Sequence, residues 1–303
     1  MNEICLVIVF NHRFDENIPK LRMIYEERFP VIRFLVPFYD GADRDVIPVY
    51  ESSYQFQGYF IQAYDRLMDT NAKCFFVIGD DLIIAPWINS SNIIDILDMR
   101  DKDFFTHCIN KFNTKGVFRW QPHARFSSKP FYSKACSWRS ELPEYHDAVK
   151  RFESFFNEPY NEKYEEDFFD IEESPSNHEI FKQDFIRNNN GSYDIPYPLA
   201  YGYSDILIIN QRKMYEFSRL CGIFAAMNLF VEIAIPTSIV LSSERKTVKT
   251  INDTSYEGRF DSDDRKCTGG ILNKFNGDFS KLYSSWDKEL LYIHPIKLSK
   301  WEV

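Results

Sequence analysis

Continuous apolar runs alternate with segments of helical period over the first 90 residues. Four runs rich in β-branched residues indicate strands, at 4–10, 31–38, 46–50 and 74–81. Runs of this kind are typical of parallel strands that are buried on both faces. The segments after the first and third runs carry apolar residues three or four apart, which predicts helices, the first of them capped by Asn17. The order strand–helix–strand–strand–helix–strand predicts an open, mostly parallel α/β sheet with flanking helices.

The pattern is less regular beyond residue 90. We predict helices over 91–99, 148–157 and 211–228, strands over 206–210, 232–241 and the centre of 288–301, and a polar, loop-rich segment over 244–270. The apolar stretch 220–241 contains Asn228, Glu232 and Pro236. A glutamate in the middle of a membrane span is costly, so we interpret this stretch as a buried helix leading into a strand. No transmembrane segment is predicted.

Polar residues follow three of the predicted strands at the point where each strand ends. They are Asn11, His12 and Arg13 after the first strand, Tyr39 and Asp40 after the second, and Asp80 and Asp81 after the fourth. Ligands of open α/β sheets bind beyond the carboxyl ends of the strands. The sequence therefore predicts a binding site at this edge of the sheet.

The net charge of −9 is concentrated in one segment. Residues 141–184 contain 14 Asp and Glu against 4 Lys and Arg, so the remainder of the chain is close to neutral. A nucleic-acid partner is disfavoured, because phosphate contacts need an excess of Lys and Arg. We interpret 141–184 as a helical insertion. It is either a solvated lobe or a lid on the acceptor side whose Phe and Tyr side chains pack on sugars.

Aromatic residues make up 17% of the chain, which fits either a Phe-rich core or platforms for bases and sugar rings. The six cysteines show no CxxC spacing, so they form no zinc or redox motif. Cys5 and Cys74 lie in apolar runs where buried free thiols are usual. The N-terminus lacks the basic region and cleavage site of a signal peptide. These features predict a cytoplasmic protein.

The pair Asp80 and Asp81 carries the clearest chemistry. An apolar strand delivers both carboxylates to the open end of the sheet, and apolar residues resume at once. Two carboxylates at a strand end are suited to hold a divalent cation, which in turn binds a diphosphate. The alternative is a polar turn, although no turn residue follows the pair.

This arrangement resembles the GT-A class of nucleotide-sugar glycosyltransferases, over roughly 1–90 and 195–303. The resemblance implies a Rossmann-like nucleotide-binding half and a DxD motif whose last Asp binds Mn²⁺ or Mg²⁺. Gly79, Asp80 and Asp81 occupy the motif here. Asp81 is therefore the implied metal ligand. Because Gly79 stands at the first position, Asp80 is implied to take the ribose or a second metal contact.

The C-terminal YIHPIKLSKW is similar to the tail of family 8 glycosyltransferases, such as glycogenin. In those enzymes a His completes the metal shell, and a Lys six residues later contacts the diphosphate. His294 and Lys300 have this spacing, and Lys297 is a second candidate for the diphosphate. A neutral imidazole is a suitable ligand beside carboxylates. Taken alone, the tail also fits a terminal strand with surface lysines.

The resemblance also implies donor and acceptor residues. Asn11, His12 and Arg13 would contact the nucleoside, with Gln57 and Gly58 opening a helix beneath it. Asp205 and Glu232 would face the acceptor hydroxyl as the general base. The alternatives are a cap for Asp205, a buried structural carboxylate for Glu232 and helix-entry residues for the donor set. The stretch from Arg119 to His123 is a weaker acceptor candidate.

Together these observations predict a single 303-residue domain. It would comprise a nucleotide-sugar half (1–90), the acidic insertion and an acceptor and diphosphate half (195–303). The expected function is metal-dependent transfer of a hexose from a UDP-sugar to a glycan or glycolipid hydroxyl, in glycan biosynthesis. A cytoplasmic enzyme of this kind could act peripherally at a membrane on a lipid-linked acceptor. The alternatives are a sugar nucleotidyltransferase and a non-catalytic carbohydrate-binding protein.

Overall fold

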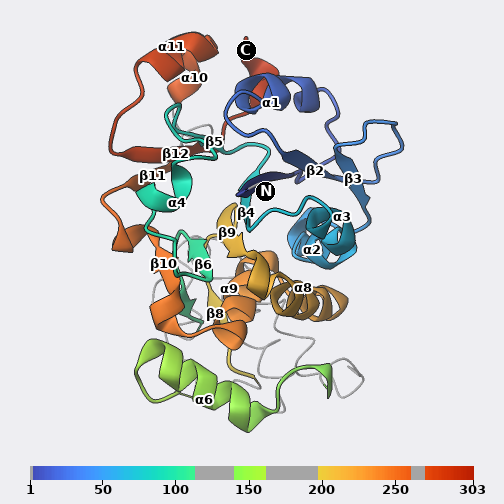
Figure 1. Ribbon diagram of the computed structural model, residues 1–303, viewed down its shortest axis with the longest axis vertical. Helices are drawn as coiled ribbons and strands as arrows, with labels where there is room; N and C mark the ends of the chain where they lie inside the picture. The colour runs from blue at the N-terminus through green and yellow to red at the C-terminus, as the bar shows by residue number, and fades with distance from the viewer. Residues whose placement is uncertain (1–2, 113–139, 162–196, 261–269) are drawn as a thin grey trace, which may run out of the picture.

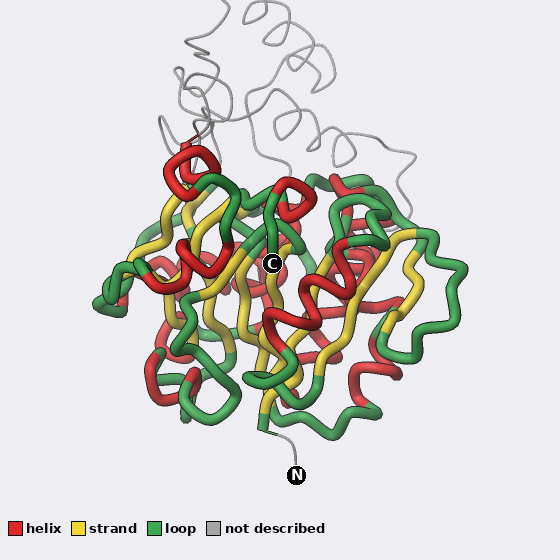
Figure 2. The backbone as a smooth tube through the Cα atoms, turned by 90° about the horizontal axis from the view of Figure 1, so that it is seen from above, coloured by secondary structure: helices red, strands yellow, loops and turns green. Residues whose placement is uncertain are grey.

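A mixed, mostly parallel sheet of seven strands forms the centre of the computed structural model (Figures 1 and 2). The structure describes residues 3–112, 140–161, 197–260 and 270–303. The strands are β1 (Ile4–Val9), β2 (Ile32–Pro37), β3 (Val46–Val49), β4 (Cys74–Gly79), β6 (Phe104–Thr106), β9 (Ile206–Asn210) and β10 (Val248–Thr250). Their order is β10-β6-β9-β4-β1-β2-β3, and β9 runs antiparallel to both of its neighbours. The predicted α/β sheet is confirmed.

Helices cover the two faces of this sheet. They are α1 (Asn17–Tyr25), α2 (Gly58–Gln62), α3 (Tyr64–Met68), α4 (Ile93–Ile96), α6 (Tyr145–Phe156), α8 (Gln211–Ala226), α9 (Val231–Ser242), α10 (Gly270–Phe275) and α11 (Phe279–Ser284). Alternate residues of β1 point to opposite faces, as the period of a strand requires. Val7 and Val9 join the core under α2, α8 and α9, whereas Leu6 and Ile8 join the core under α1 and the C-terminal helices. Figure 1 shows α1 on one side of β1 and β2, with α2 and α8 on the other.

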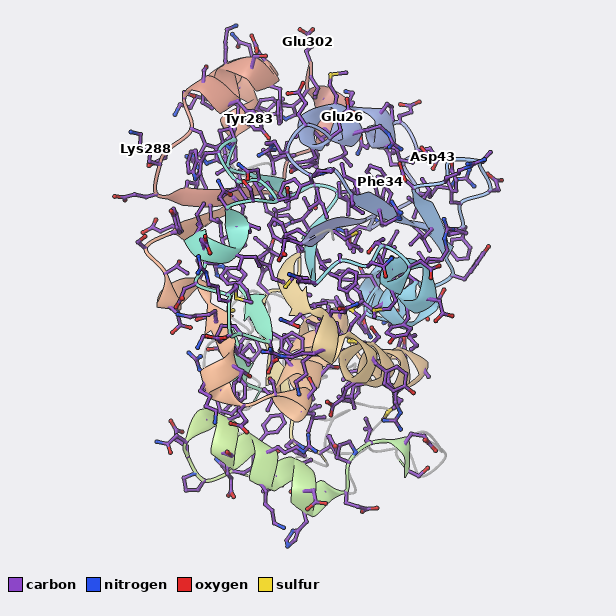
Figure 3. All side chains as sticks on the ribbon, in the orientation of Figure 1. Glu26, Phe34, Asp43, Tyr283, Lys288 and Glu302 are labelled. Carbon is purple, nitrogen blue, oxygen red and sulfur yellow. The ribbon has the colours of Figure 1, made fainter. Side chains whose placement is uncertain are left out.

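The side chains follow the same division between core and rim. Phe34 of β2 is fully buried, whereas Glu26, Lys288 and Glu302 are exposed at the rim of the molecule (Figure 3). Cys5 and Cys74 are buried free thiols, as the sequence predicts. No helix among the described residues is long and apolar enough to span a bilayer.

A smaller sheet ties the C-terminal tail to the end of β4. Its strands are β11 (Glu257–Phe260), β12 (Leu290–His294) and β5 (Ile83–Ile84), in the order β11-β12-β5. Ile293 pairs with Ile83, and the N–H of Ile296 donates to the carbonyl of Asp81 at 2.6 Å. The tail that carries His294 is thereby held against the residues that follow β4.

The remaining regular elements are short. A two-stranded sheet joins β7 (Asn110–Lys111) and β8 (Ala200–Tyr201). The 3-10 turns are η1 (Ser53–Gln55), η5 (Arg245–Thr247), η6 (Ile251–Asp253) and η8 (Leu298–Lys300). The segment 244–270, predicted to be loop-rich, therefore contributes β10 and β11. The Arg119–His123 stretch and the acidic segment beyond residue 161 lie outside the described residues.

The prediction of a strand over 232–241 is wrong, because α9 is a helix with Pro236 inside it. Pro236 has no N–H, so the carbonyl of Glu232 one turn earlier loses its helical donor. The N–H of Gly202 replaces that donor, at 2.9 Å from the Glu232 oxygen. The hydroxyl of Ser238 donates to the carbonyl of Ala234 at 2.7 Å, which satisfies a polar side chain inside the core.

The prediction that Asn17 caps α1 is also wrong. Asn17 is the first helical residue, and Glu16 stands at the cap position without a side-chain hydrogen bond. Asn17 is 7% exposed, and its side chain lies close enough to Asp80, the residue after β4, to act against the rise in the pKa of that carboxyl. This residue therefore faces the edge of the sheet where the polar strand ends meet.

Candidate functional site

Four carboxylates and one imidazole gather at the carboxyl ends of the central strands. Asp80 and Asp81 follow β4, Asp205 precedes β9, Glu232 begins α9, and His294 ends β12. Because β9 is antiparallel to β4, its first residue lies beside the last residue of β4. The N–H of Gly79 accordingly donates to the carbonyl of Asp205 at 3.0 Å.

This cluster lies where the strand order reverses. The chain runs from β1 outward through β2 and β3, then returns to place β4 on the other side of β1. Such a switch point opens a crevice beyond the strand ends, where ligands of α/β sheets bind. Val9 pairs with Gly79, so both strands end level. The N–H of Asn11 then donates to an Asp80 carboxylate oxygen at 3.2 Å, which joins the segments that follow the two strands.

His294 lies between two of the carboxylates. Its Nε2 is 3.4 Å from Oδ1 of Asp81 and 3.9 Å from Oδ2 of Asp205. Oδ1 of Asp81 is buried and accepts no hydrogen bond from the described residues. A Cβ on Gly79 would lie 3.2 Å from that atom and 3.5 Å from Oδ1 of Asp205. The glycine therefore leaves free space between the two carboxylates.

Burial and mutual repulsion raise the pKa values of three of these carboxyls. Burial, with the charge of Asp81, raises the pKa of Asp80 to about 7. Burial raises the pKa of Asp205 to about 6, although His294 acts against the shift. Burial, with the charge of Asp205, raises the pKa of Glu232 to about 8. The cluster therefore holds protons near neutral pH that ordinary carboxyls would have lost.

The pKa of His294 is raised by its carboxylate neighbours. Burial alone would lower the pKa of His294, but the charges of Asp81, Asp205 and Glu232 outweigh burial and raise it. A proton on His294 partly neutralises the carboxylates that surround it. A bound cation would do the same more fully and would take the imidazole in its neutral form.

Two pairs of donors lie close enough to share a divalent cation. Two donors can share one ion when their separation is at most twice the bond length, about 4.2 Å for bonds of about 2.1 Å. Both His294 contacts meet that limit, and Oδ1 of Asp81 has a free lone pair. Among the described residues, however, no three His, Cys, Asp or Glu side chains already stand together as a cation cluster. The donors are present as the two pairs measured above.

The predicted nucleoside residues do not all reach this cluster. Asn11 does so through its backbone. Arg13 instead forms exposed ion pairs with Asp15 at 3.0 Å and Asp40 at 2.5 Å, which join the ends of β1 and β2. These carboxylates raise the pKa of Arg13, and Arg13 in turn lowers that of Asp40. His12 is exposed nearby.

Gln57 and Gly58 have structural contacts. Nε2 of Gln57 donates to the carbonyl of Leu229 at 2.8 Å, and the residue is fully buried. A Cβ on Gly58 would approach the Cβ of Ala225 to 2.9 Å, so this glycine allows α2 to lie close to α8. Their assignment to the donor site stays a prediction.

The two candidate lysines lie on the tail beyond β12. Lys297 and Lys300 are exposed and flank η8. Nζ of Lys20 donates to the carbonyls of Leu298 and Trp301 at 2.9 and 2.8 Å, which fixes this turn against α1. Both candidates thus project from an anchored turn that follows His294 by a few residues.

Sequence reasoning missed an aromatic group beside the carboxylates. This ring cluster consists of His107, Tyr203, Phe260, Tyr292 and His294. Tyr203 and Tyr292 are stacked at 8°, and the Tyr292 hydroxyl lies 2.7 Å from Nδ1 of His107. A Cβ on Gly258 would meet the Tyr292 ring, so that glycine allows the ring to lie across β11. Only the strand pairings, which no local pattern reveals, bring these rings together.

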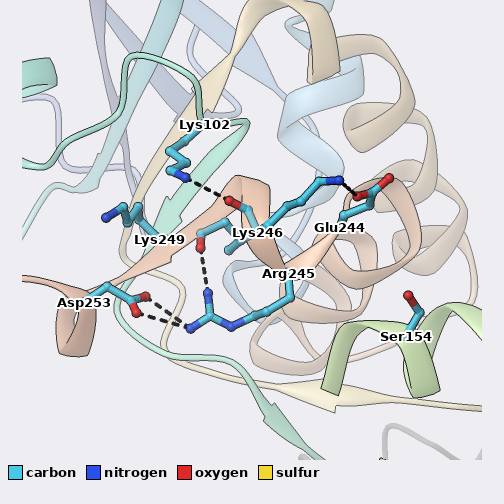
Figure 4. Close-up of a pocket in the computed structure, with 8 residues that line it drawn as sticks. Lys102, Ser154, Glu244, Arg245, Lys246, Lys249 and Asp253 are labelled. Atoms are coloured by element: carbon cyan, nitrogen blue, oxygen red, sulfur yellow. Dashed lines mark hydrogen bonds and ion pairs between the residues drawn. The ribbon is translucent and has the colours of Figure 1, made fainter. Parts of the chain in front are cut away.

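A polar cavity of about 520 Å³ lies elsewhere, between α6 and the segment from η5 to η6 (Figure 4). Its lining residues Lys102, Arg245 and Lys246 precede β6 and β10, so they come from the amino ends of those strands. Lys246 lies 2.7 Å from Glu244, and Arg245 lies 3.2 Å from Asp253. These ion pairs engage two of the four basic side chains that line the cavity, and we assign it no ligand.

No protein-family model matches the chain, and no curated protein is significantly similar to it.

The raised pKa values predict how stability depends on pH. A carboxyl whose pKa lies above its ordinary value of about 4 contributes stability that is lost as pH rises toward the folded-state pKa. Asp205, Asp80 and Glu232, with pKa values of about 6, 7 and 8, act in the same direction. We expect the metal-free protein to melt lower at about pH 8.5 than at about pH 5.5.

Mn²⁺ should reverse this dependence, because protons compete with a cation for the same donors. The increase in melting temperature on adding Mn²⁺ should be larger at the higher pH. Differential scanning fluorimetry over a pH series, with Mn²⁺ and with EDTA, measures both effects. A metal-free melting temperature that rises steadily across this range would contradict the expected protonation of the cluster.

Proposed function

We propose that the protein is a divalent-metal-dependent glycosyltransferase that transfers a hexose from a UDP-sugar to a glycan or lipid-linked hydroxyl. The observation that carries the proposal is the convergence of Asp81, Asp205 and His294 at the switch point of the sheet. Donors of this type suit Mn²⁺ or Mg²⁺, and the position suits a nucleotide. On this proposal the fold is of the GT-A type, with 1–90 and 195–303 as donor and acceptor halves.

The proposed metal would be held by Asp81 and His294, with Asp80 or Asp205 beside them. When bound, the cation would stabilise the negative charge that develops on the departing diphosphate. Asp80 is oriented for such a role by the Asn11 N–H, and its side chain is only slightly exposed. On this proposal, Lys297 and Lys300 would add positive charge beside the diphosphate.

Glu232 and Asp205 are the candidates to accept the proton of the acceptor hydroxyl. The carbonyl of Glu232 is fixed by Gly202, three residues before Asp205 in the chain. The pKa of Glu232, raised to about 8 by burial, places its proton affinity near that of a general base that works at neutral pH. No ion pair or hydrogen bond engages its carboxylate among the described residues. The residue is therefore available to a substrate.

The binding of UDP with and without Mn²⁺ tests the proposal. UDP should raise the melting temperature of the purified chain in Mn²⁺ and have little effect in EDTA, because the diphosphate needs the cation as a bridge. Hydrolysis of UDP-glucose, UDP-galactose and UDP-N-acetylglucosamine should then identify the donor. A UDP shift that is independent of metal would contradict the diphosphate–metal arrangement. An absence of any nucleotide effect, with glycan binding present, would favour a carbohydrate-binding protein.

A further inference from the structure

Phe260 is the exposed member of the ring cluster. It ends β11, and 45% of its surface is exposed, although it contacts four other rings. Its centroid lies 5.0 Å from that of Tyr203, 5.3 Å from His107, 6.1 Å from Tyr292 and 6.4 Å from His294. What distinguishes Phe260 from other exposed aromatic residues is that it packs against His294, so its exposed surface lies beside the carboxylate cluster.

The orientation of the ring leaves stacking surface available. Phe260 makes interplanar angles of 80° to 88° with its four neighbours. These are edge-to-face contacts, so no ring among the described residues lies parallel to it. Tyr203 and Tyr292, by contrast, already stack on each other. The Phe260 ring therefore has no parallel aromatic partner among the described residues, and its exposed part is an aromatic surface for a flat apolar ligand.

The location of the ring indicates which part of a ligand it would meet. His294 is both a member of the ring cluster and a neighbour of Asp81 and Asp205. In a UDP-sugar the hexose is joined to the β-phosphate through a single oxygen. The ring centroids of Phe260 and His294 are 6.4 Å apart, so the group attached to a diphosphate held at His294 is the part of the ligand nearest to Phe260. A pyranose presents an apolar face of C–H groups that suits an aromatic partner.

We propose that Phe260 is the platform on which the hexose of the nucleotide-sugar donor stacks, so that this residue determines donor affinity through the sugar and not through the nucleotide. This inference rests on the proposed function. It assigns to Phe260 a binding role in the donor complex and gives the surrounding rings the role of holding it. Tyr203, Tyr292 and His107 fix Phe260 from the side, and the exposed face receives the sugar.

The test compares the affinities for UDP and UDP-hexose in Mn²⁺ by isothermal titration calorimetry. The hexose is the one of glucose, galactose and N-acetylglucosamine that the wild-type protein hydrolyses. In Phe260→Ala the ratio of the dissociation constants, UDP-hexose over UDP, should rise about tenfold, since loss of one stacking contact is worth about 1.4 kcal/mol. Phe260→Tyr keeps the aromatic face, so its ratio should match the wild type.

Two further variants separate stacking from folding. Phe260→Leu keeps apolar bulk without an aromatic face and replaces Phe260→Ala if that protein melts early. Tyr215→Ala removes an exposed aromatic side chain on α8 and should leave the ratio unchanged. A Phe260→Leu or Phe260→Ala variant that weakens UDP and UDP-hexose equally, or that loses only transfer to the acceptor, would overturn the inference. Failure of the wild type to bind UDP in Mn²⁺ would instead overturn the proposed function.

Discussion

Asp81→Asn should lose the Mn²⁺-dependent part of UDP binding and about 10³-fold in turnover, and should melt at a higher temperature than the wild type. The loss follows because Oδ1 of Asp81 is a buried acceptor that has no donor among the described residues and lies 3.4 Å from Nε2 of His294. The gain in stability follows because Asp81 repels the carboxylates of Asp80 and Asp205 and thereby raises their pKa values. Calorimetry with UDP and Mn²⁺, a hydrolysis assay and a thermal melt measure the three effects.

Asp98→Asn is the matched control for this variant. Asp98 forms an ion pair with Lys249 at 2.9 Å on the surface, and its side chain is 78% exposed. The same chemical change there should alter neither UDP binding nor turnover. If Asp81→Asn instead retained full metal-dependent UDP affinity, the assignment of Asp81 as a ligand would be wrong. If it lost activity and melted lower, Asp81 would have a structural role that the repulsion argument does not include.

Glu232→Gln should reduce turnover about 10²- to 10⁴-fold while leaving UDP and Mn²⁺ affinity unchanged, the range expected for loss of a general base. The substitution keeps the size of the side chain and removes a carboxyl whose pKa burial raises to about 8. The contacts of His294 within 4 Å are with Asp81 and Asp205, so the metal site should survive the change. Separate measurement of kcat and of the dissociation constant for UDP tests this split.

Asp205→Asn provides the comparison that assigns the base. Asp205 lies 3.9 Å from Nε2 of His294, so its loss should weaken metal-dependent UDP binding as well as turnover. If Glu232→Gln keeps near wild-type kcat while Asp205→Asn lowers kcat with binding intact, the two roles must be exchanged. Partial rescue of Glu232→Gln at higher pH would support its assignment as the base, since hydroxide would then take the proton that glutamine cannot accept.

The sheet was predictable because strands that are buried on both faces consist almost entirely of apolar residues. Every residue of β1 and β4 is buried, and such strands must be continuous apolar runs. The same logic misassigned α9. A helix buried on nearly all sides has no polar face, so its sequence loses the period of 3.6 that identifies a helix and resembles a buried strand. Pro236 is tolerated inside this helix because the N–H of Gly202, which is distant in sequence, replaces the donor that proline lacks.

Only the site residues that directly follow a recognisable strand were predictable. Asp80 and Asp81 follow a recognisable strand, and topology rules place a site at that edge. That Asp205 lies beside Gly79 depends on β9 being antiparallel, which its apolar pattern does not reveal. Phe260 was not identified for a related reason. The pairing of β11 with β12 brings Phe260 beside Tyr292. His107, which the Phe260 ring also contacts, lies about 150 residues earlier in the chain.

The antiparallel strand β9 also determines how the chain can be divided. It pairs with β4 on one side and with β6 on the other. Without β9, β4 would be the edge strand of the sheet formed by β1 to β4. A fragment that ends near residue 90 would leave β4 with a row of free backbone donors and acceptors along an apolar strand, an edge prone to aggregation. The first four strands and the segment that contains β9 are therefore inseparable parts of one folding unit. A ligand that tightens either half should protect the backbone amides of both.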